Sequence, residues 1–353
     1  MSWNWKKKTL GLVAGLSLVF TAACGGSDTS TSEEKDANEG GEAASQEVSY
    51  QDYPKTVKVG TASQGGTYFI VGGGLASLLE NELDVTANVE VTGGPVHNMQ
   101  LTQAGDQDVG FVTLGPAYEG YTGTGEWTAG NKMEDVRIAF PMYTTPIHWW
   151  ALEDSGVDSI EEIAGQRVGV GPAGGTSGTY VPLIHDVLGL DTENVQAGAS
   201  DMASQQMDGQ LDIIGYAAGI PISAVSEIEV QRKINFFGID GEMRDKVIEE
   251  FPYFFPFTIP ADTYTTLDHD IETIAMFNFG IVHKDANPDF VYDLVKAYHE
   301  NQDELIGTHA SMEEAVAEAI TINDSVPLHP GAIKYYEEIG IELPESVYPA
   351  EWE

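Results

Sequence analysis

Residues 57–68 read VKVGTASQGGTY, and this short stretch decides the fold. Its first residues alternate as in a β-strand, a glycine-rich turn follows, and from Tyr68 to Asn81 apolar residues recur at helical spacing. The same order returns at residues 167–179, RVGVGPAGGTSGT, which lead into a helical pattern that ends at Leu188. A strand, a glycine-rich turn and a helix begin a parallel βαβ unit. We therefore expect two α/β lobes of similar build.

Other strand and helix patterns alternate around these two turns. Gly105 and Asp108 precede one strand of the first series, and Gly209 and Asp212 stand in the same way before a strand of the second. Such an internal echo favours two related lobes over chance matching of glycines. The remaining elements predicted are strands at 88–91, 109–112, 195, 212–216 and 234–238, and helices at 96–104 and 202–207.

Two longer runs rich in strand formers, Ile138–Glu153 and Thr273–His283, follow the two series. A pair of extended crossings between lobes is what a hinge-bending protein needs. From about Asn287 onward the pattern is helical, and we expect these helices to pack on the first lobe. The prediction is an α/β fold of two lobes, each with a mostly parallel sheet flanked by helices, joined by two hinge crossings. Lobe I is assigned to residues 53–145 and 255–353, and lobe II to 146–254.

The N-terminus predicts export and a lipid anchor. Lys6, Lys7 and Lys8 precede an apolar run, Leu10–Ala23, which suits a signal peptide and is short for a membrane span. Cys24 follows it directly and is the single cysteine of the chain, so a disulfide within the chain and a cysteine-based metal site are excluded.

We interpret residues 1–23 as a lipoprotein signal peptide and Cys24 as the lipidated residue. The alternative is an inert cysteine that is removed with the peptide. Residues 24–52 are mostly small and acidic, and predict a flexible linker. The expected location is therefore outside the cytoplasm, on the outer face of the cell membrane.

The charge of the chain restricts its partners. The sequence has 56 Asp and Glu against 16 Lys and Arg, a formal net charge of -40. Binding to nucleic acid needs a basic surface, so this class of partner is excluded. A strongly acidic surface keeps a protein soluble and weakly associating, and we expect a monomer.

The two glycine-rich turns are candidate anion sites. At the start of a helix, free N–H groups and the positive end of the helix dipole point at the same place, and glycine lets a ligand approach the backbone. The alternative is that both are only tight turns. The predicted ligand contacts, from these turns and the nearby strand ends, are Gly66, Thr67, Tyr68, Gly94, Asn98, Thr113, Leu114, Gly175, Thr176, Ser177, Thr179, Tyr216 and Gly219.

Signatures of catalysis are weak or missing in the sequence. Gly169, Gly171 and Gly174 match the spacing of a dinucleotide fingerprint, but in mid-chain and with Pro172 in the turn. The eight histidines form no metal-ligand motif; His148, beside two tryptophans, is equally well a core residue or a ligand contact. We therefore expect no enzyme activity, no cofactor and no metal.

Several short motifs together resemble one family. They are Gly60-Thr61, Gly65-Gly66-Thr67-Tyr68, Thr92-Gly93-Gly94 with Asn98 and Leu101, Gly105-x-x-Asp108-x-Gly110-Phe111-Val112, Gly171-Pro172, Ile259-Pro260-Ala261-x-Thr263-Tyr264 and Pro327-Leu328-His329-Pro330-Gly331-Ala332. From about Tyr53 to the C-terminus the chain resembles the TAXI family of TRAP-transporter substrate-binding proteins. One departure is the loop 171–179, which is longer than the turn usual in that family.

The resemblance implies a type II periplasmic-binding fold and a function in transport. It implies a receptor that captures a small anionic solute, such as glutamate or the dicarboxylate 2-oxoglutarate, and delivers it to the membrane-embedded subunits of a TRAP transporter driven by an ion gradient. A binding protein of an ABC-type transporter has a similar fold and is the nearest alternative. A secreted enzyme is the alternative from another class.

Overall fold

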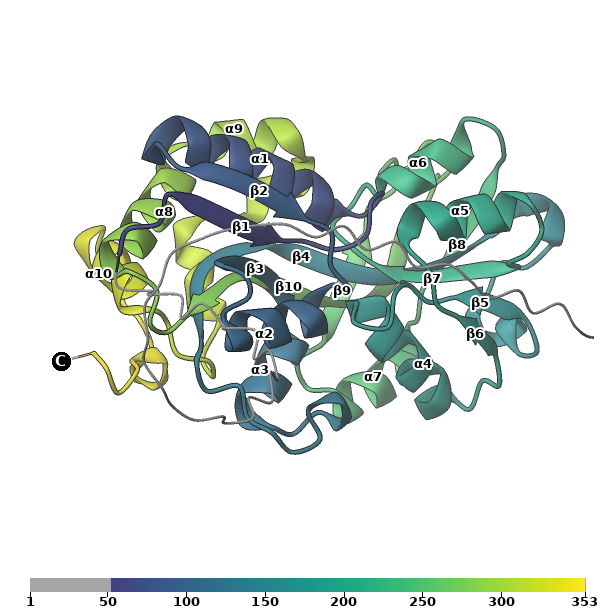
Figure 1. Ribbon diagram of the computed structural model, residues 1–353. Coiled ribbons are helices and arrows are strands. Elements are labelled where there is room, and N and C mark those ends of the chain that lie inside the picture. Colours follow the sequence, from purple (N-terminus) through teal and green to yellow (C-terminus); the bar gives the residue numbers. More distant parts are fainter. Residues whose placement is uncertain (1–51, 353) are drawn as a thin grey trace, which may run out of the picture. The chain divides into compact units, whose positions relative to one another are not determined.

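The strand–turn–helix order predicted at both glycine-rich turns is present in the computed structural model, which describes residues 52–352 (Figure 1). The first series is β1 (Thr56–Gly60), α1 (Thr67–Leu83), β2 (Thr86–Glu90), α2 (Pro95–Ala104), β3 (Val109–Thr113) and α3 (Leu114–Thr122). The second series is β5 (Arg167–Gly169), α4 (Thr176–Leu188), β6 (Glu193–Val195), α5 (Ala199–Met207), β7 (Ile213–Ala217) and α6 (Ser223–Glu229).

Two long strands connect the series, and helices complete the C-terminal part. The remaining strands and helices are β4 (Val136–Leu152), β8 (Ile234–Phe237), α7 (Gly241–Glu250), β9 (Phe255–Ile259), β10 (Ile271–His283), α8 (Pro288–Glu300), α9 (Gln302–Thr308) and α10 (Pro330–Glu338). Helix α8 begins where its sequence predicts, because the side chain of Asn287 accepts a hydrogen bond from the Phe290 N–H (2.9 Å) and Pro288 occupies the first helical position.

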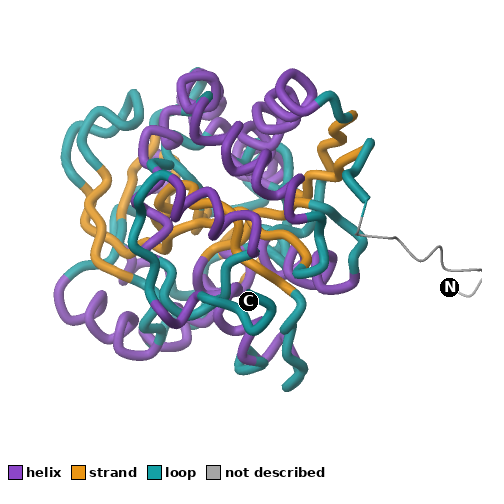
Figure 2. The backbone as a smooth tube through the Cα atoms, turned by 90° about the vertical axis from the view of Figure 1, so that its left-hand side faces the viewer, coloured by secondary structure: helices purple, strands orange, loops and turns teal. Residues whose placement is uncertain are grey.

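The strands form one continuous sheet with the order β2-β1-β3-β10-β4-β7-β5-β6, with β8 beside β4 and β9 beside β10. Strand β1 runs parallel to β2 and β3, and β5 runs parallel to β6 and β7, as βαβ units require. The long strands β4 and β10 are antiparallel to all their neighbours. Helices lie on both sides of the strands (Figure 2).

Strands β4 and β10 are the two crossings that the sequence predicts. They pair from His283 opposite Val136 to Ile274 opposite Ile147. At one end β10 pairs with β3, and at the other end β4 pairs with β7 and β8. Every residue of β4 is buried, which explains its continuous run of apolar and aromatic residues.

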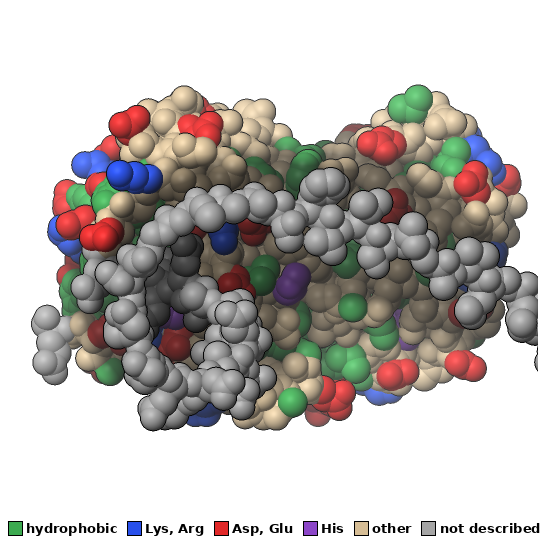
Figure 3. Space-filling view, viewed as in Figure 1, with side chains coloured by type: hydrophobic (Ala, Val, Ile, Leu, Met, Phe, Trp, Pro, Cys, Tyr) green, Lys and Arg blue, Asp and Glu red, His purple; other side chains and the backbone are tan. Residues whose placement is uncertain are grey.

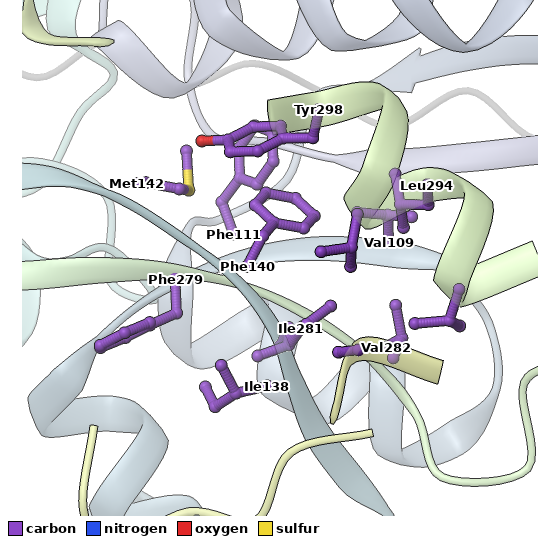
Figure 4. Packing of buried hydrophobic residues seen from close by; sticks show 14 of the residues in the cluster. Val109, Phe111, Ile138, Phe140, Met142, Phe279, Ile281, Val282, Leu294 and Tyr298 are labelled. Atoms are coloured by element: carbon purple, nitrogen blue, oxygen red, sulfur yellow. The ribbon is translucent and has the colours of Figure 1, made fainter. Parts of the chain in front are cut away.

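Three clusters of buried apolar residues divide the described part of the chain into two halves. The first cluster joins β1–β3, α1, the start of β4, the end of β10 and the C-terminal helices; we call these elements, together with α2 and α3, the first half. Figure 4 shows its centre, where Phe140 packs on Tyr298 with ring centroids 4.3 Å apart. The other two clusters contain residues between 147 and 276, which we call the second half. Asp and Glu side chains are scattered over the visible face of both halves (Figure 3).

Candidate ligand-binding site

A small cavity lies between the two halves, with a volume of about 30 Å³. It opens at the carboxyl ends of the parallel strands β1, β3 and β7, the place where ligands bind in open α/β sheets. Residues of both halves form its wall, and β4 and β10 form its floor. The lining residues are Ala62, Gly66, Thr67, Tyr68, Pro95, Thr113, Tyr143, Thr145, Pro172, Gly175, Thr176, Ser177, Tyr216, Ala217, Ala218 and Asn278.

Three helices begin at this cavity. The residues just before α1, α3 and α4 are Gly66, Thr113 and Gly175, and all three line the wall. None of the three caps its helix through a side chain. Because the first N–H groups of a helix have no partner within the helix, each start offers donors and a partial positive charge to the cavity. The arrangement favours an anionic group.

Hydroxyl groups predicted as ligand contacts join the two halves beside the cavity. The Thr67 hydroxyl donates to the carbonyl of Gly219 (2.6 Å), so α1 is bonded to the loop after β7. The hydroxyls of Thr113 and Thr176 are 3.0 Å apart and share a hydrogen bond. These contacts place the starts of α1 and α3 in the first half opposite the second half.

The halves also meet through backbone near the start of α2. The Val96 N–H donates to the carbonyl of Gly174 (3.0 Å). Gly94, just before the helix, has φ +107°, and a Cβ there would lie 2.8 Å from the Cα of Gly175. Position 94 therefore requires glycine for two reasons: its own backbone conformation, and the close approach of the second half.

The floor of the cavity is a network of buried polar side chains. The Tyr68 hydroxyl donates to Oδ1 of Asn278 (2.6 Å), and Nδ2 of Asn278 donates to Oγ1 of Thr145 (2.6 Å) and to the carbonyl of Tyr143. Burial raises the pKa of both Tyr68 and Tyr143 well above the usual tyrosine value, so both hydroxyls stay protonated. The Tyr143 hydroxyl is buried and has no hydrogen-bond partner among the described residues.

Two further predicted residues are in the second-half wall. The Ser177 hydroxyl, in the first turn of α4, accepts from the Ala217 N–H (2.8 Å) and so ties this turn to the end of β7. The Tyr216 hydroxyl lies 3.4 Å from that of Ser63 in the other half. Both side chains line the cavity.

The structure corrects the prediction for Asn98. This residue is fully buried in α2 and does not line the cavity. Its Nδ2 donates to the carbonyls of Thr61 and Phe111, each at 2.8 Å, and its Oδ1 accepts from Thr92 (2.7 Å). Both Nδ2 protons are therefore used within the core and are not available to a ligand. Asn98 holds the carboxyl ends of β1 and β3 together and so positions the wall.

Four other predicted residues do not line the cavity. Gly94 and Gly219 act through backbone contacts between the halves, as described above. Leu114 packs against the first core cluster. Thr179 is half-buried one turn into α4. Cys24 lies outside the described residues.

The floor residues were not predicted as ligand contacts. Tyr143 and Thr145 come from β4 and Asn278 from β10, more than 130 positions apart in the chain. The available signal was a polar residue inside an otherwise apolar strand, as Asn278 is within AMFNFGIV. The other lining residues missing from the prediction are Ala62, Pro95, Pro172, Ala217 and Ala218.

His148 is a core residue and not a ligand contact. It is buried in the second half, and its Nε2 lies 3.0 Å from the hydroxyl of Tyr264. Burial lowers its pKa to about 3, so the ring is neutral near pH 7. Trp149 and Trp150 are also buried, and their indole N–H groups donate to His185 (3.0 Å) and Gln206 (3.1 Å). None of these residues reaches the cavity.

Between residues 52 and 352, no group of three or more His, Cys, Asp or Glu side chains is placed to hold a metal ion. No helix in the same range is long and apolar enough to span a membrane.

Comparison with solved structures identifies the fold. The malate-bound protein MatC from Rhodopseudomonas palustris aligns with a TM-score of 0.53 at 14% identity, over 80% of this chain and 96% of its own. The periplasmic binding protein BugD aligns with the same TM-score and identity, over 82% of this chain and all of its own. The protein therefore has the two-lobed α/β fold of periplasmic binding proteins.

Comparison with protein families shows to which family the chain belongs. The model of the NMT1-like family matches residues 59–340. The match begins within β1 and ends just after α10, so it includes both halves and every residue that lines the cavity. The chain belongs to the NMT1-like family.

Proposed function

We propose that this protein is an extracytoplasmic solute receptor that captures a small carboxylate between its two halves and does not transform it. One observation carries the proposal: the starts of α1, α3 and α4 converge on a cavity to which both halves contribute. A cavity of about 30 Å³ has room for only one or two waters, so the halves must separate to admit a carboxylate. A ligand held there touches both halves, so its binding energy favours the conformation in which they close around it.

The chemistry of the wall fits a carboxylate. A helix start contributes about 0.3–2 kcal/mol to the binding of an anion, and three starts together can hold one without a lysine or arginine. The net charge of -40 does not oppose this, because exposed charges more than about 8 Å away are largely screened at physiological salt. The structural neighbour MatC was solved with bound malate, which is itself a small dicarboxylate.

The proposed partner is a TRAP-type transporter, and the proposed anchor is a lipid on Cys24. The partner follows from the sequence resemblance to the TAXI family, whose motifs include the turn before α1. The anchor follows from the position of Cys24 after a basic and apolar N-terminus. The sequence assigns residues 53–145 with 255–353 to one lobe and 146–254 to the other. Because Ile259, Tyr264 and Leu267 pack with the second half, we propose instead that the second lobe extends to residue 276.

A thermal-shift screen of the mature chain against dicarboxylates, monocarboxylates, amino acids, sugars and polyamines tests the receptor function. A ligand present at about 100 times its dissociation constant adds about 2.7 kcal/mol to the stability of the folded state. We expect stabilisation by small carboxylates. The Thr67→Asp variant, with a negative charge at the start of α1, is the matched control and should show no shift. Stabilisation by sugars or polyamines alone would contradict the proposal.

A further inference from the structure

We propose that the cavity selects small carboxylates that lack an amino group, and that the Tyr143 hydroxyl is the side-chain donor that holds them. The inference deepens the proposed function and rests on it. It concerns a choice that the sequence leaves open, namely whether the ligand is an amino acid such as glutamate or an oxo- or hydroxy-acid of the same size.

The charges of the wall argue against an ammonium group. None of the described residues that line the cavity has a charged side chain, either acidic or basic. An ammonium group moved from water into this cavity would lose its hydration and find no carboxylate on the wall. Among the described residues, the one carboxylate whose charge acts on Tyr143, that of Glu314, is outside the wall and already accepts from the Thr144 N–H (2.9 Å). The three helix starts also present their positive ends to the same space, so the field that attracts a carboxylate repels a cation.

The Tyr143 hydroxyl has a property that the other hydroxyls of the cavity lack. Its side chain is fully buried and lines the floor, yet the hydroxyl has no partner among the described residues. Buried polar groups are nearly always hydrogen-bonded, and one that is left over in a ligand cavity points to a bond with the ligand. The raised pKa keeps the proton on the oxygen, so the group donates to an acceptor.

A second donor lies beside it on the floor. Thr145 accepts from Nδ2 of Asn278 (2.6 Å), which leaves the proton of its own hydroxyl free to donate. Asn278 is fixed in this orientation because its Oδ1 accepts from Tyr68. The floor therefore presents hydroxyl donors to the ligand, which match the oxygen of an oxo group, a hydroxyl or a carboxylate.

Calorimetry on matched pairs of ligands tests the inference: 2-oxoglutarate against glutamate, and malate against aspartate. Members of a pair differ mainly at one carbon, so the amino group is the variable. We expect the acid without the amino group to bind at least about 100-fold more tightly. Tyr143→Phe should weaken its binding about tenfold or more, and should leave the melting temperature of the free protein unchanged or higher, because the hydroxyl has no protein partner to lose.

Tyr336→Phe is the matched control. Its hydroxyl is also buried, but it donates to the carbonyl of Ala139 (3.2 Å) and lies away from the cavity, so the variant should lose stability and keep its affinity. Amino acids that bind as tightly as their oxo- or hydroxy-acid partners would overturn the selection while leaving the receptor function intact. Full affinity in Tyr143→Phe would overturn the role of Tyr143. If no carboxylate binds, the proposed function itself fails.

Discussion

Thr67 offers the sharpest test of how the ligand is held. Its side chain is buried at the first position of α1 and lines the cavity, and its hydroxyl donates to the carbonyl of Gly219 in the other half (2.6 Å). Thr67→Val removes the hydroxyl and keeps the shape of the side chain. Thr67→Asp places a carboxylate at the same point, a position at a helix start where an acidic residue does not disturb the helix.

The two variants differ in expected magnitude. Losing one hydrogen bond between the halves costs about 0.5–1.5 kcal/mol, which weakens the affinity about tenfold at most. Two like charges about 4 Å apart repel by about 4 kcal/mol at the effective dielectric constant near a protein surface. Thr67→Asp should therefore weaken the binding of a carboxylate by a factor of about 1,000, which nearly abolishes it.

Isothermal titration with the best ligand from the screen measures both variants, after their melting temperatures show that they are folded. Thr179→Val is the control, because Thr179 lies one turn further into α4 and does not line the cavity. Its affinity should match that of the native protein. If Thr67→Asp binds di-acids as tightly as Thr67→Val does, the helix starts do not hold a carboxylate, and the ligand is neutral or cationic.

Three further predictions concern closure, acid stability and anchoring. In Gly94→Ala the added Cβ, 2.8 Å from the Cα of Gly175, should hold the halves apart, so small-angle scattering should show no decrease in radius of gyration when ligand is added. Gly73→Ala is the control, because its Cβ would point into open space, and this variant should contract as the native protein does. Contraction of both variants would contradict the role of Gly94. The pKa of His148 falls from 6.5 to about 3 on folding, so the unfolded chain takes up the proton first as the pH falls. This group therefore contributes stability above pH 6.5 that is lost at about 1.4 kcal/mol per pH unit below it. Urea midpoints that are equal at about pH 7 and pH 5, measured in about 0.5 M salt to screen repulsion between acidic groups, would count against this role of His148. Cys24→Ser should release the protein from the membrane fraction, and unchanged fractionation would rule out the lipid anchor.

The predicted fold was confirmed where local pattern and turn chemistry agree. The strand before Gly65, the helix from Tyr68 and the matching pair around Gly174 all form, because a change from alternating to helical spacing across a glycine-rich turn has few other solutions. The direction in which strands pair was harder to predict from the sequence. The strand at 234–238 continues the strand–helix alternation and suggests a parallel neighbour, yet β8 runs antiparallel to β4. A buried strand is apolar on both faces whichever neighbour it has, so its sequence does not reveal its direction.

The candidate site was likewise predictable in part: its helix starts could be predicted from the sequence, and its floor could not. The starts of α1 and α4 are recognisable because a glycine-rich turn before a helix has one chemical consequence, a set of free N–H groups. The structure places Asn98 in the core and not on the wall: an amide near a helix start suits a ligand and a strand carbonyl equally well, and only the packing of β1 beside β3 decides between them. Tyr143 and Asn278 were missed because they are far apart in the chain, and only the pairing of β4 with β10 brings them together.

The position of β10 in the sheet has a consequence for the order in which the chain can fold. Strand β10 lies between β3 and β4, and Asn278 pairs with Thr113, although well over a hundred residues of the second half separate them in sequence. The first core cluster also needs residues as late as Val347. When only the N-terminal part of the chain has been synthesised, the sheet therefore still lacks β10, the strand between β3 and β4. Domains usually fold from the N-terminus as they emerge, but here the beginning of the chain must wait for its end. Such a delay suits a polypeptide that is threaded through a membrane before it folds.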